Sequence, residues 1–185
     1  MDPRTFDFVT VGSPLHDAAA LRLSLEPYLS ALAGLGGREA GEEALPGAAP
    51  VAFVVAAGGT EAEVLRLRAL REAAAPGEPL LLVTVPGHNS LPAALETLGR
   101  VRQEQGRGRI VHLASPDDAA SLGRLSAALD DLRVLGRLGR SRIGLVGTPS
   151  DWLVASVPAA EAVREVWGPE TVSVDLAGVL DAPLQ

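Results

Sequence analysis

The chain has 185 residues, of which 47% are apolar and 21% are charged, and its mean hydropathy is +0.22. These values predict one globular domain with a sizeable core and exclude a largely disordered chain. The formal charge is -7, and only six residues are aromatic. Because nucleic-acid binding needs basic patches and stacking rings, the composition argues against a nucleic-acid partner.

All 16 cationic residues are Arg, and the chain contains neither Lys nor Cys. The absence of Lys excludes Schiff-base chemistry and a Walker A phosphate loop. The absence of Cys excludes disulfides, thiolate nucleophiles and the usual zinc or iron-sulfur clusters. No signal peptide is visible and no apolar run is long enough to cross a bilayer, so we expect a cytoplasmic protein without a membrane partner.

Six short apolar runs bounded by Gly or Pro predict β-strands, at residues 6–11, 51–56, 80–85, 109–113, 142–146 and 171–174. Segments with helical periodicity follow them, at residues 14–35, 61–75, 91–104, 116–139 and 158–167. Pro27 predicts a kink or a break in the first helix. The alternation predicts a doubly wound α/β fold, with an open, mostly parallel sheet of five or six strands and helices on both faces, Rossmann-like or flavodoxin-like.

Capping residues stand where these helices are expected to begin. Ser13 precedes Pro14, Thr60 and Glu63 have the spacing of a capping box, and the segment 115–118 (SPDD) combines a cap with a first-turn proline. Residues 36–50 are rich in Gly, Glu, Ala and Pro and predict an exposed loop rather than a domain linker. The sequence therefore predicts a single domain over residues 1–185. A Leu series at 122, 125, 129, 132, 135 and 138 is expected to cover the sheet, with a subunit interface as the alternative.

In an open parallel sheet, the loops that leave the carboxyl ends of the strands share one edge, and ligands bind there. Polar residues gather in these turns and suit a polyhydroxyl or anionic ligand. We predict that the following residues bind it: Gly58, Gly59, Thr60, Glu61, His88, Asn89, Ser90, Ser150, Asp151 and Trp152.

Each of these candidates also has a purely structural explanation. Gly58 and Gly59 can serve a tight turn, with Thr60 as a helix cap. Asn89 tolerates a left-handed turn, and Ser150 and Asp151 can cap a helix. His16 and His88 would form part of a metal site only if the strand order brings their turns together, and no short-range ligand spacing supports one. We therefore predict no metal-binding and no catalytic residue in this chain.

Three of the turn segments resemble the amino-terminal part of the L-fucose and L-arabinose isomerase-like proteins. The resemblance spans residues 51–176 and is carried by segments 57–61 (AGGTE), 86–96 (PGHNSLPAALE) and 147–156 (GTPSDWLVAS). It implies a cytoplasmic, manganese-dependent family of oligomeric aldose-ketose isomerases, whose amino-terminal domains help to form substrate pockets across subunit boundaries.

In that family the metal ligands, a Glu, an Asp and a His, lie in later domains, and no motif of this chain matches them. The resemblance thus implies an amino-terminal domain that contributes sugar recognition and oligomer assembly but is not catalytic alone, with no cofactor of its own. Its expected partners are a small sugar and either further copies of the chain or a catalytic domain. The alternative is an interaction or assembly module that kept the fold without sugar binding.

Overall fold

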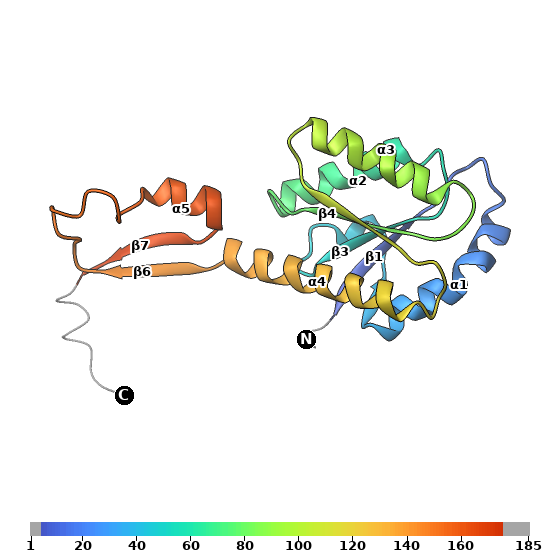
Figure 1. Ribbon diagram of the computed structural model, residues 1–185, viewed down its shortest axis with the longest axis horizontal. Coiled ribbons are helices and arrows are strands. Elements are labelled where there is room, and N and C mark those ends of the chain that lie inside the picture. Colours follow the sequence, from blue (N-terminus) through green and yellow to red (C-terminus); the bar gives the residue numbers. More distant parts are fainter. Residues whose placement is uncertain (1–4, 176–185) are drawn as a thin grey trace. The chain divides into compact units, whose positions relative to one another are not determined.

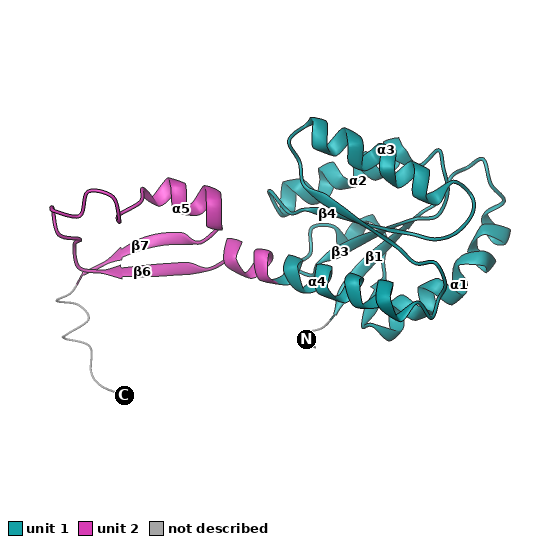
Figure 2. Cartoon of the chain, in the orientation of Figure 1, with its two compact units in different colours: residues 1–133 teal, residues 134–185 magenta. Residues whose placement is uncertain are grey.

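The computed structural model describes residues 5–175. The chain divides into two compact units, Met1–Arg133 and Val134–Gln185 (Figure 2), where the sequence had predicted one domain. The boundary falls within the long helix Ala119–Gly139. No helix among the described residues combines the length and the apolar character that a membrane crossing requires.

The first unit is built on a five-stranded parallel sheet with the strand order β2-β1-β3-β4-β5 (Figure 1). Its strands are β1 (Phe6–Val11), β2 (Gly37–Glu39), β3 (Val51–Val55), β4 (Leu80–Thr84) and β5 (Gly108–His112). Every residue of β3 and β4 is buried, as expected for central strands covered on both faces. The predicted doubly wound α/β fold is confirmed.

Helices cover both faces of this sheet: α1 (Ala18–Gly34), α2 (Glu61–Ala74), α3 (Ser90–Gln103) and α4 (Ala119–Gly139). Successive strand residues point to opposite faces, so Ala52 and Val54 join one core cluster and Phe53 and Val55 the other. The first cluster contains the buried faces of α1 and α4, and the second those of α2 and α3. In α4, Leu125, Leu129 and Leu132 are buried in the first cluster, so this part of the Leu series covers the sheet.

The second unit contains β6 (Arg142–Val146), α5 (Ala160–Trp167) and β7 (Glu170–Val174). β6 and β7 pair with each other in parallel as a separate two-stranded sheet. Two of the six predicted strands therefore do not join the main sheet. Its fifth strand is β2, which lies inside the segment predicted to be a loop and is followed by a short 3-10 helix (Glu42–Ala44).

The capping interactions observed at the helix N-termini differ from those predicted. Asp17, not Ser13, caps α1, with its carboxylate 2.7 Å from the amide nitrogen of Ala20. Thr60 makes no capping bond, so the predicted capping box with Glu63 does not form. At α4, Asp118 accepts the amide hydrogen of Ser121. Helix α1 continues through Pro27 as a single element and is not split into two helices.

Candidate functional site

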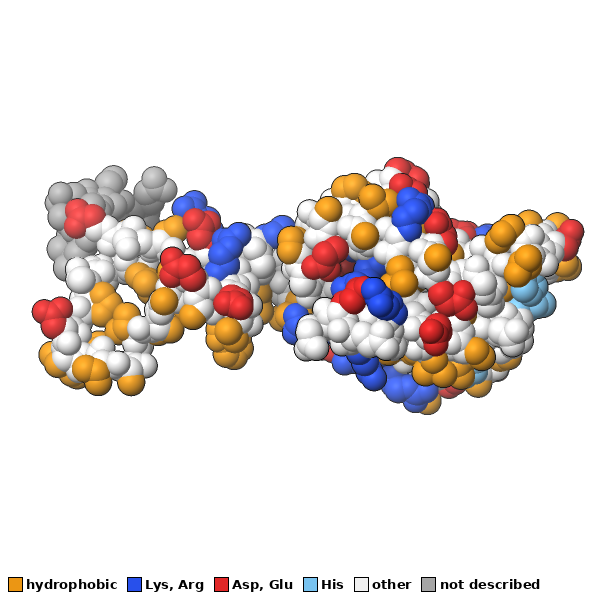
Figure 3. Space-filling model, turned by 90° about the horizontal axis from the view of Figure 1, so that it is seen from above, with side chains coloured by type: hydrophobic (Ala, Val, Ile, Leu, Met, Phe, Trp, Pro, Cys, Tyr) orange, Lys and Arg blue, Asp and Glu red, His pale blue; other side chains and the backbone are white. Residues whose placement is uncertain are grey.

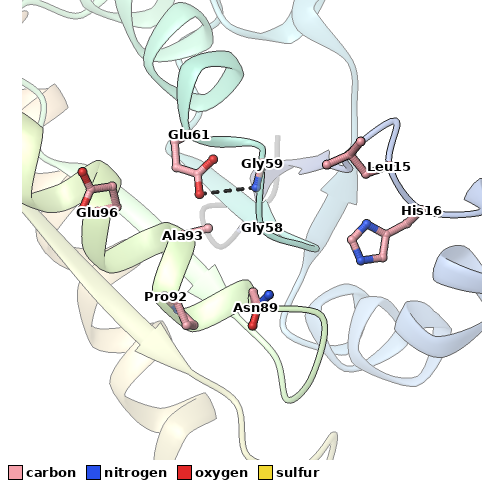
Figure 4. Close-up of a pocket in the computed structure, with 9 residues that line it drawn as sticks. All are labelled: Leu15, His16, Gly58, Gly59, Glu61, Asn89, Pro92, Ala93 and Glu96. Carbon is pink, nitrogen blue, oxygen red and sulfur yellow. Dashed lines mark hydrogen bonds between the residues drawn. The ribbon is translucent and has the colours of Figure 1, made fainter.

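The strand order places a cleft at the carboxyl edge of the first unit. From β1, the chain adds β2 on one side of the sheet and β3 on the other, so the strand order reverses between β1 and β3. Ligands of doubly wound proteins bind where the strand order reverses. A cleft of about 510 Å³ opens beside these strand ends. Its lining comes from the turns after β1 and β3 and from the start of α3: Leu15, His16, Gly58, Gly59, Glu61, Asn89, Pro92, Ala93 and Glu96 (Figure 4).

The turn after β3, which contains Gly58 and Gly59, contributes the middle of three lining segments, with the turn after β1 and the start of α3 as the other two. Gly59 has φ +79°, which a residue with a side chain rarely adopts. A Cβ atom on Gly58 would lie 3.0 Å from the Cβ of Asn89, and one on Gly59 would lie 3.2 Å from the Ser13 hydroxyl oxygen. The two glycines therefore let the turns after β1, β3 and β4 pack closely together.

Two backbone N–H groups of this turn already have acceptors. The amide of Gly58 donates to the carbonyl of His88 at 2.7 Å, and the amide of Gly59 donates to the Glu61 carboxylate at 3.3 Å (Figure 4). A phosphate cradle needs free N–H groups that point at the ligand. The amides of Gly58 and Gly59 are therefore not free to bind an anion, and the Glu61 carboxylate already stands at the N-terminus of α2.

The turn after β4 contains three consecutive residues in the left-handed region: Gly87, His88 and Asn89 have φ values of 87°, 49° and 56°. Asn89 makes no capping bond to α3, so a capping role does not account for it. A non-glycine residue held in this region costs about 1–3 kcal/mol, and such strain gathers at functional sites. The turn presents Asn89 to the cleft.

Two of the predicted binding residues, Ser90 and Thr60, are buried and hold these turns in place by hydrogen bonds. The Ser90 hydroxyl donates to the Val55 carbonyl at 2.6 Å and accepts the Val85 amide at 3.1 Å, and so joins the ends of β3 and β4. The Thr60 hydroxyl donates to the Ala57 carbonyl at 2.7 Å. Both side chains are buried and line no part of the cleft. Their positions give them a structural role.

His16 and His88 come from different turns and meet edge to face, with ring centroids 5.2 Å apart and an interplanar angle of 82°. His16 lines the cleft and its ring points toward the glycine turn (Figure 4), whereas His88 is exposed beside it. The Nδ1 atom of His16 is buried and has no hydrogen-bond partner among the described residues.

The charge of the lining is acidic. Glu61 and Glu96 contribute carboxylates, Asn89 contributes an amide, and no Arg belongs to the lining of this cleft in the described part of the chain. A phosphate or carboxylate ligand would meet like charges there. Hydroxyl groups, by contrast, can donate to carboxylate oxygens, so the lining favours a neutral ligand rich in hydroxyl groups.

A second, more apolar cleft of about 420 Å³ lies on the other side of the turn after β1, and His16 borders both. Its one cation, Arg22, is bound to Glu39 at 2.5 Å. Hydrogen bonding to Arg22 holds the pKa of Glu39 below its usual range. Arg22 is thus already neutralised by a protein carboxylate, and this cleft offers little to a charged ligand.

The third predicted segment lies in the other unit. Ser150, Asp151 and Trp152 follow β6 and are exposed, with 77% of Trp152 accessible. The candidate site therefore consists of Gly58, Gly59, Glu61 and Asn89 from the predicted set, with His88 at its margin.

Sequence reasoning left five lining residues out of its predicted site: Leu15, His16, Pro92, Ala93 and Glu96. A signal for the last three was present, because Pro92, Ala93 and Glu96 recur at helical spacing directly after Asn89. His16 was placed at the correct edge of the sheet but was not assigned to the ligand.

The donor set does not fit the manganese ion that the family resemblance implies. Among residues 5–175, no group of three or more His, Asp and Glu side chains is placed to hold a metal ion. Manganese is usually held by several oxygen ligands together. Chemistry that depends on manganese therefore has no ligand set in the described residues.

No protein-family model matches the chain, and no curated protein matches it. The candidate site is a cleft at the point where the strand order reverses. Its lining contains the carboxylates of Glu61 and Glu96 and the amide of Asn89, next to a strained turn and two closely packed glycines.

Proposed function

We propose that the Met1–Arg133 unit binds a small, uncharged polyhydroxy molecule, a sugar, in the cleft at the carboxyl edge of its sheet. The observation that carries the proposal is the joint lining by Glu61, Asn89 and Glu96 at the switch in strand order. Carboxylates accept hydrogen bonds from neighbouring hydroxyl groups, and an amide both donates and accepts. Leu15, Pro92 and Ala93 offer apolar surface to the C–H groups of a sugar ring.

The motifs that resemble the isomerase family support the same ligand class. Two of the three, at residues 57–61 and 86–96, supply seven of the nine lining residues. We therefore propose that the chain acts as an amino-terminal, substrate-recognising domain of an aldose-ketose isomerase in the cytoplasm. Pentoses and 6-deoxyhexoses are its expected ligands, and the catalytic manganese site would be supplied by residues other than those described.

Isothermal titration calorimetry with L-arabinose and L-fucose tests this function. We expect both sugars to bind the unaltered chain, and Asn89→Gly to weaken binding about tenfold, the effect of losing one well-placed hydrogen bond. Glycine suits the left-handed backbone at this position, so this variant removes the amide without adding strain. Glu61→Gln, which replaces a lining carboxylate, should also bind more weakly.

The matched control is Glu26→Gln, which removes one negative charge from α1, where Glu26 forms a surface ion pair with Arg22. It should bind both sugars as the unaltered chain does. Inorganic phosphate should give no binding heat. The proposal is wrong if neither sugar binds, or if Asn89→Gly and Glu61→Gln both retain full affinity.

The alternative, an assembly module, is favoured by the second unit. Several large apolar side chains are exposed there, among them Leu145, Val146, Trp152, Val154 and Trp167, and apolar side chains are visible on its surface in Figure 3. Exposed apolar surface of this kind marks interaction sites. Analytical ultracentrifugation distinguishes the outcomes: a concentration-dependent oligomer supports assembly, and a monomer at every concentration contradicts it.

A further inference from the structure

We propose that His16 and His88 form a two-histidine site for a divalent transition-metal ion that prefers imidazole nitrogen, such as Zn²⁺ or Ni²⁺, at the margin of the cleft. The proposal concerns the metal ion alone and does not depend on sugar binding. It rests on the approach of the two rings, on the unpartnered nitrogen of His16 and on the acidic surroundings.

The backbone brings the two rings together. The amide of His16 donates to the Ser13 carbonyl at 3.2 Å, which fixes the turn after β1. The carbonyl of His88 accepts the Gly58 amide at 2.7 Å, which fixes the strained turn after β4. The ring centroids are 5.2 Å apart. This separation is compatible with two imidazoles that each place one nitrogen about 2.0–2.1 Å from a shared ion.

The His16 ring has a nitrogen that no protein group satisfies. Its Nδ1 is buried and has no hydrogen-bond partner among the described residues. Buried polar atoms are nearly always paired, so an unpaired one calls for a water molecule, an ion or a strained role. By contrast, Nδ1 of His112, the third histidine of the chain, lies 3.0 Å from the Thr84 hydroxyl oxygen.

The surroundings favour a cation. Glu61 and Glu96 line the same cleft as His16, and no Arg in the described chain lines it. Imidazole ligands select zinc, nickel and copper over manganese and magnesium. Two protein ligands leave the other coordination positions open to water or to ligand oxygens, as catalytic metal sites also do. The proposed site has two protein ligands. It is therefore consistent with the finding that no group of three or more potential metal ligands occurs among residues 5–175.

The first test follows histidine side-chain nitrogens by NMR while Zn²⁺ is added to the untagged chain without sugar. Because the chain has three histidines, the assignment is simple. We expect the His16 and His88 signals to shift together at the same Zn²⁺ concentration and the His112 signal to stay in place. Shifts of one ring alone, of all three rings equally, or of none would overturn the proposal.

The second test measures Ni²⁺ and Zn²⁺ affinity by calorimetry for His16→Asn, His88→Asn and the double variant. Asn tolerates the positive φ of position 88, so the turn should persist. Each single variant should lose about tenfold or more in affinity, because the second imidazole binds at high effective concentration. The double variant should lose little more. Additive, small losses would indicate independent adventitious binding at single histidines and contradict the proposal.

A failure here leaves sugar binding untouched, since the probe is the metal ion alone. Conversely, a chain that binds Zn²⁺ through both rings but binds neither sugar would support this site and contradict the proposed function.

Discussion

Ser90 is the side chain on which the geometry of the cleft depends most. Its hydroxyl joins β3 to β4 and is fully buried. Replacing it with Ala leaves the Val85 amide without that acceptor, and an unsatisfied buried group costs about 1–3 kcal/mol. We expect Ser90→Ala to lower the free energy of unfolding by that amount in urea denaturation.

The control for this prediction is Ser24→Ala in α1, where the hydroxyl donates to the Leu21 carbonyl within the same helix. That carbonyl is also positioned for the regular helix bond, so the change should be small. An equal loss in both variants would contradict the role assigned to Ser90.

Arg71 fixes the segment that the sequence predicted to be an exposed loop. Its guanidinium donates to the carbonyls of Leu45, Gly47 and Ala49 and forms an ion pair with Glu78 at 2.6 Å, and it is only 5% exposed. Removing one member of a buried ion pair costs about 3–5 kcal/mol. We expect Arg71→Met to destabilise the first unit by that amount in urea denaturation.

Arg66→Met provides the comparison on the same helix. Arg66 also pairs with carboxylates, Glu42 and Glu63, but all three side chains are about half exposed. Exposed ion pairs contribute little to stability. If both arginine variants lost the same stability, the carbonyl contacts of Arg71 would not have the importance assigned to them.

At the scale of the element, the N-terminus of α4 predicts a pH effect. Hydrogen bonds from the hydroxyl and amide of Ser121 hold the pKa of Asp118 below its usual range. The folded state thus favours the ionised carboxylate. Its contribution to stability is fully present above the unfolded pKa of about 3.9 and is lost as the pH falls through the lower folded value.

Carboxyl NMR during an acid titration measures this directly, and we expect Asp118 to titrate below an ordinary aspartate. Asp118→Asn should correspondingly reduce the dependence of stability on pH below about 4. An Asp118 signal that titrates at or above the ordinary aspartate value would contradict the capping geometry.

The elements of the main sheet show which signals can be predicted from sequence. Strand β3 is a continuous apolar run, β4 is apolar up to its final Thr84, and β1 is apolar except for Asp7 and Thr10. The sequence predicted all three strands to within about one residue. Strand β2 has the sequence GRE and no apolar side chain, so periodicity could not reveal it. It forms because its backbone pairs with β1, supported by the contact of Arg38 with Asp7.

The capping pattern at α2 shows the limit of short motifs. Thr60 and Glu63 have the required spacing, yet Thr60 has φ -107° and ψ -2°, which is a helical rather than an extended backbone. In that conformation its hydroxyl reaches back to the Ala57 carbonyl. The glycine turn directly before Thr60 packs closely against Ser13 and Asn89, and such long-range packing does not appear in the local sequence.

At the scale of the whole molecule, strand order decides which predicted residues meet. β1, β3 and β4 are consecutive neighbours in the sheet, so the turns at residues 16, 58 and 88 come together, which the sequence had left dependent on strand order. β6 pairs only with β7, so the segment with Ser150 and Trp152 belongs to another unit. Sequence periodicity identifies strands but does not give their order, so it could not show that β6 and β7 form a sheet of their own.

The two units should also differ in local stability. β3 and β4 are buried throughout, whereas every residue of β6 is exposed. A two-stranded sheet is marginally stable on its own. In native-state hydrogen exchange, we expect the amides of β3 and β4 to exchange slowest and those of β6 and β7 much faster. Equal protection in both sheets would contradict this view of the second unit.

The most direct test of the central claim is an amide NMR titration of the full chain with L-arabinose and L-fucose. The account predicts saturable shifts of Gly58, Gly59, Glu61 and Asn89, with little change in β6 and β7. Shifts confined to other parts of the chain, or none at saturating sugar, would contradict a sugar site in this cleft.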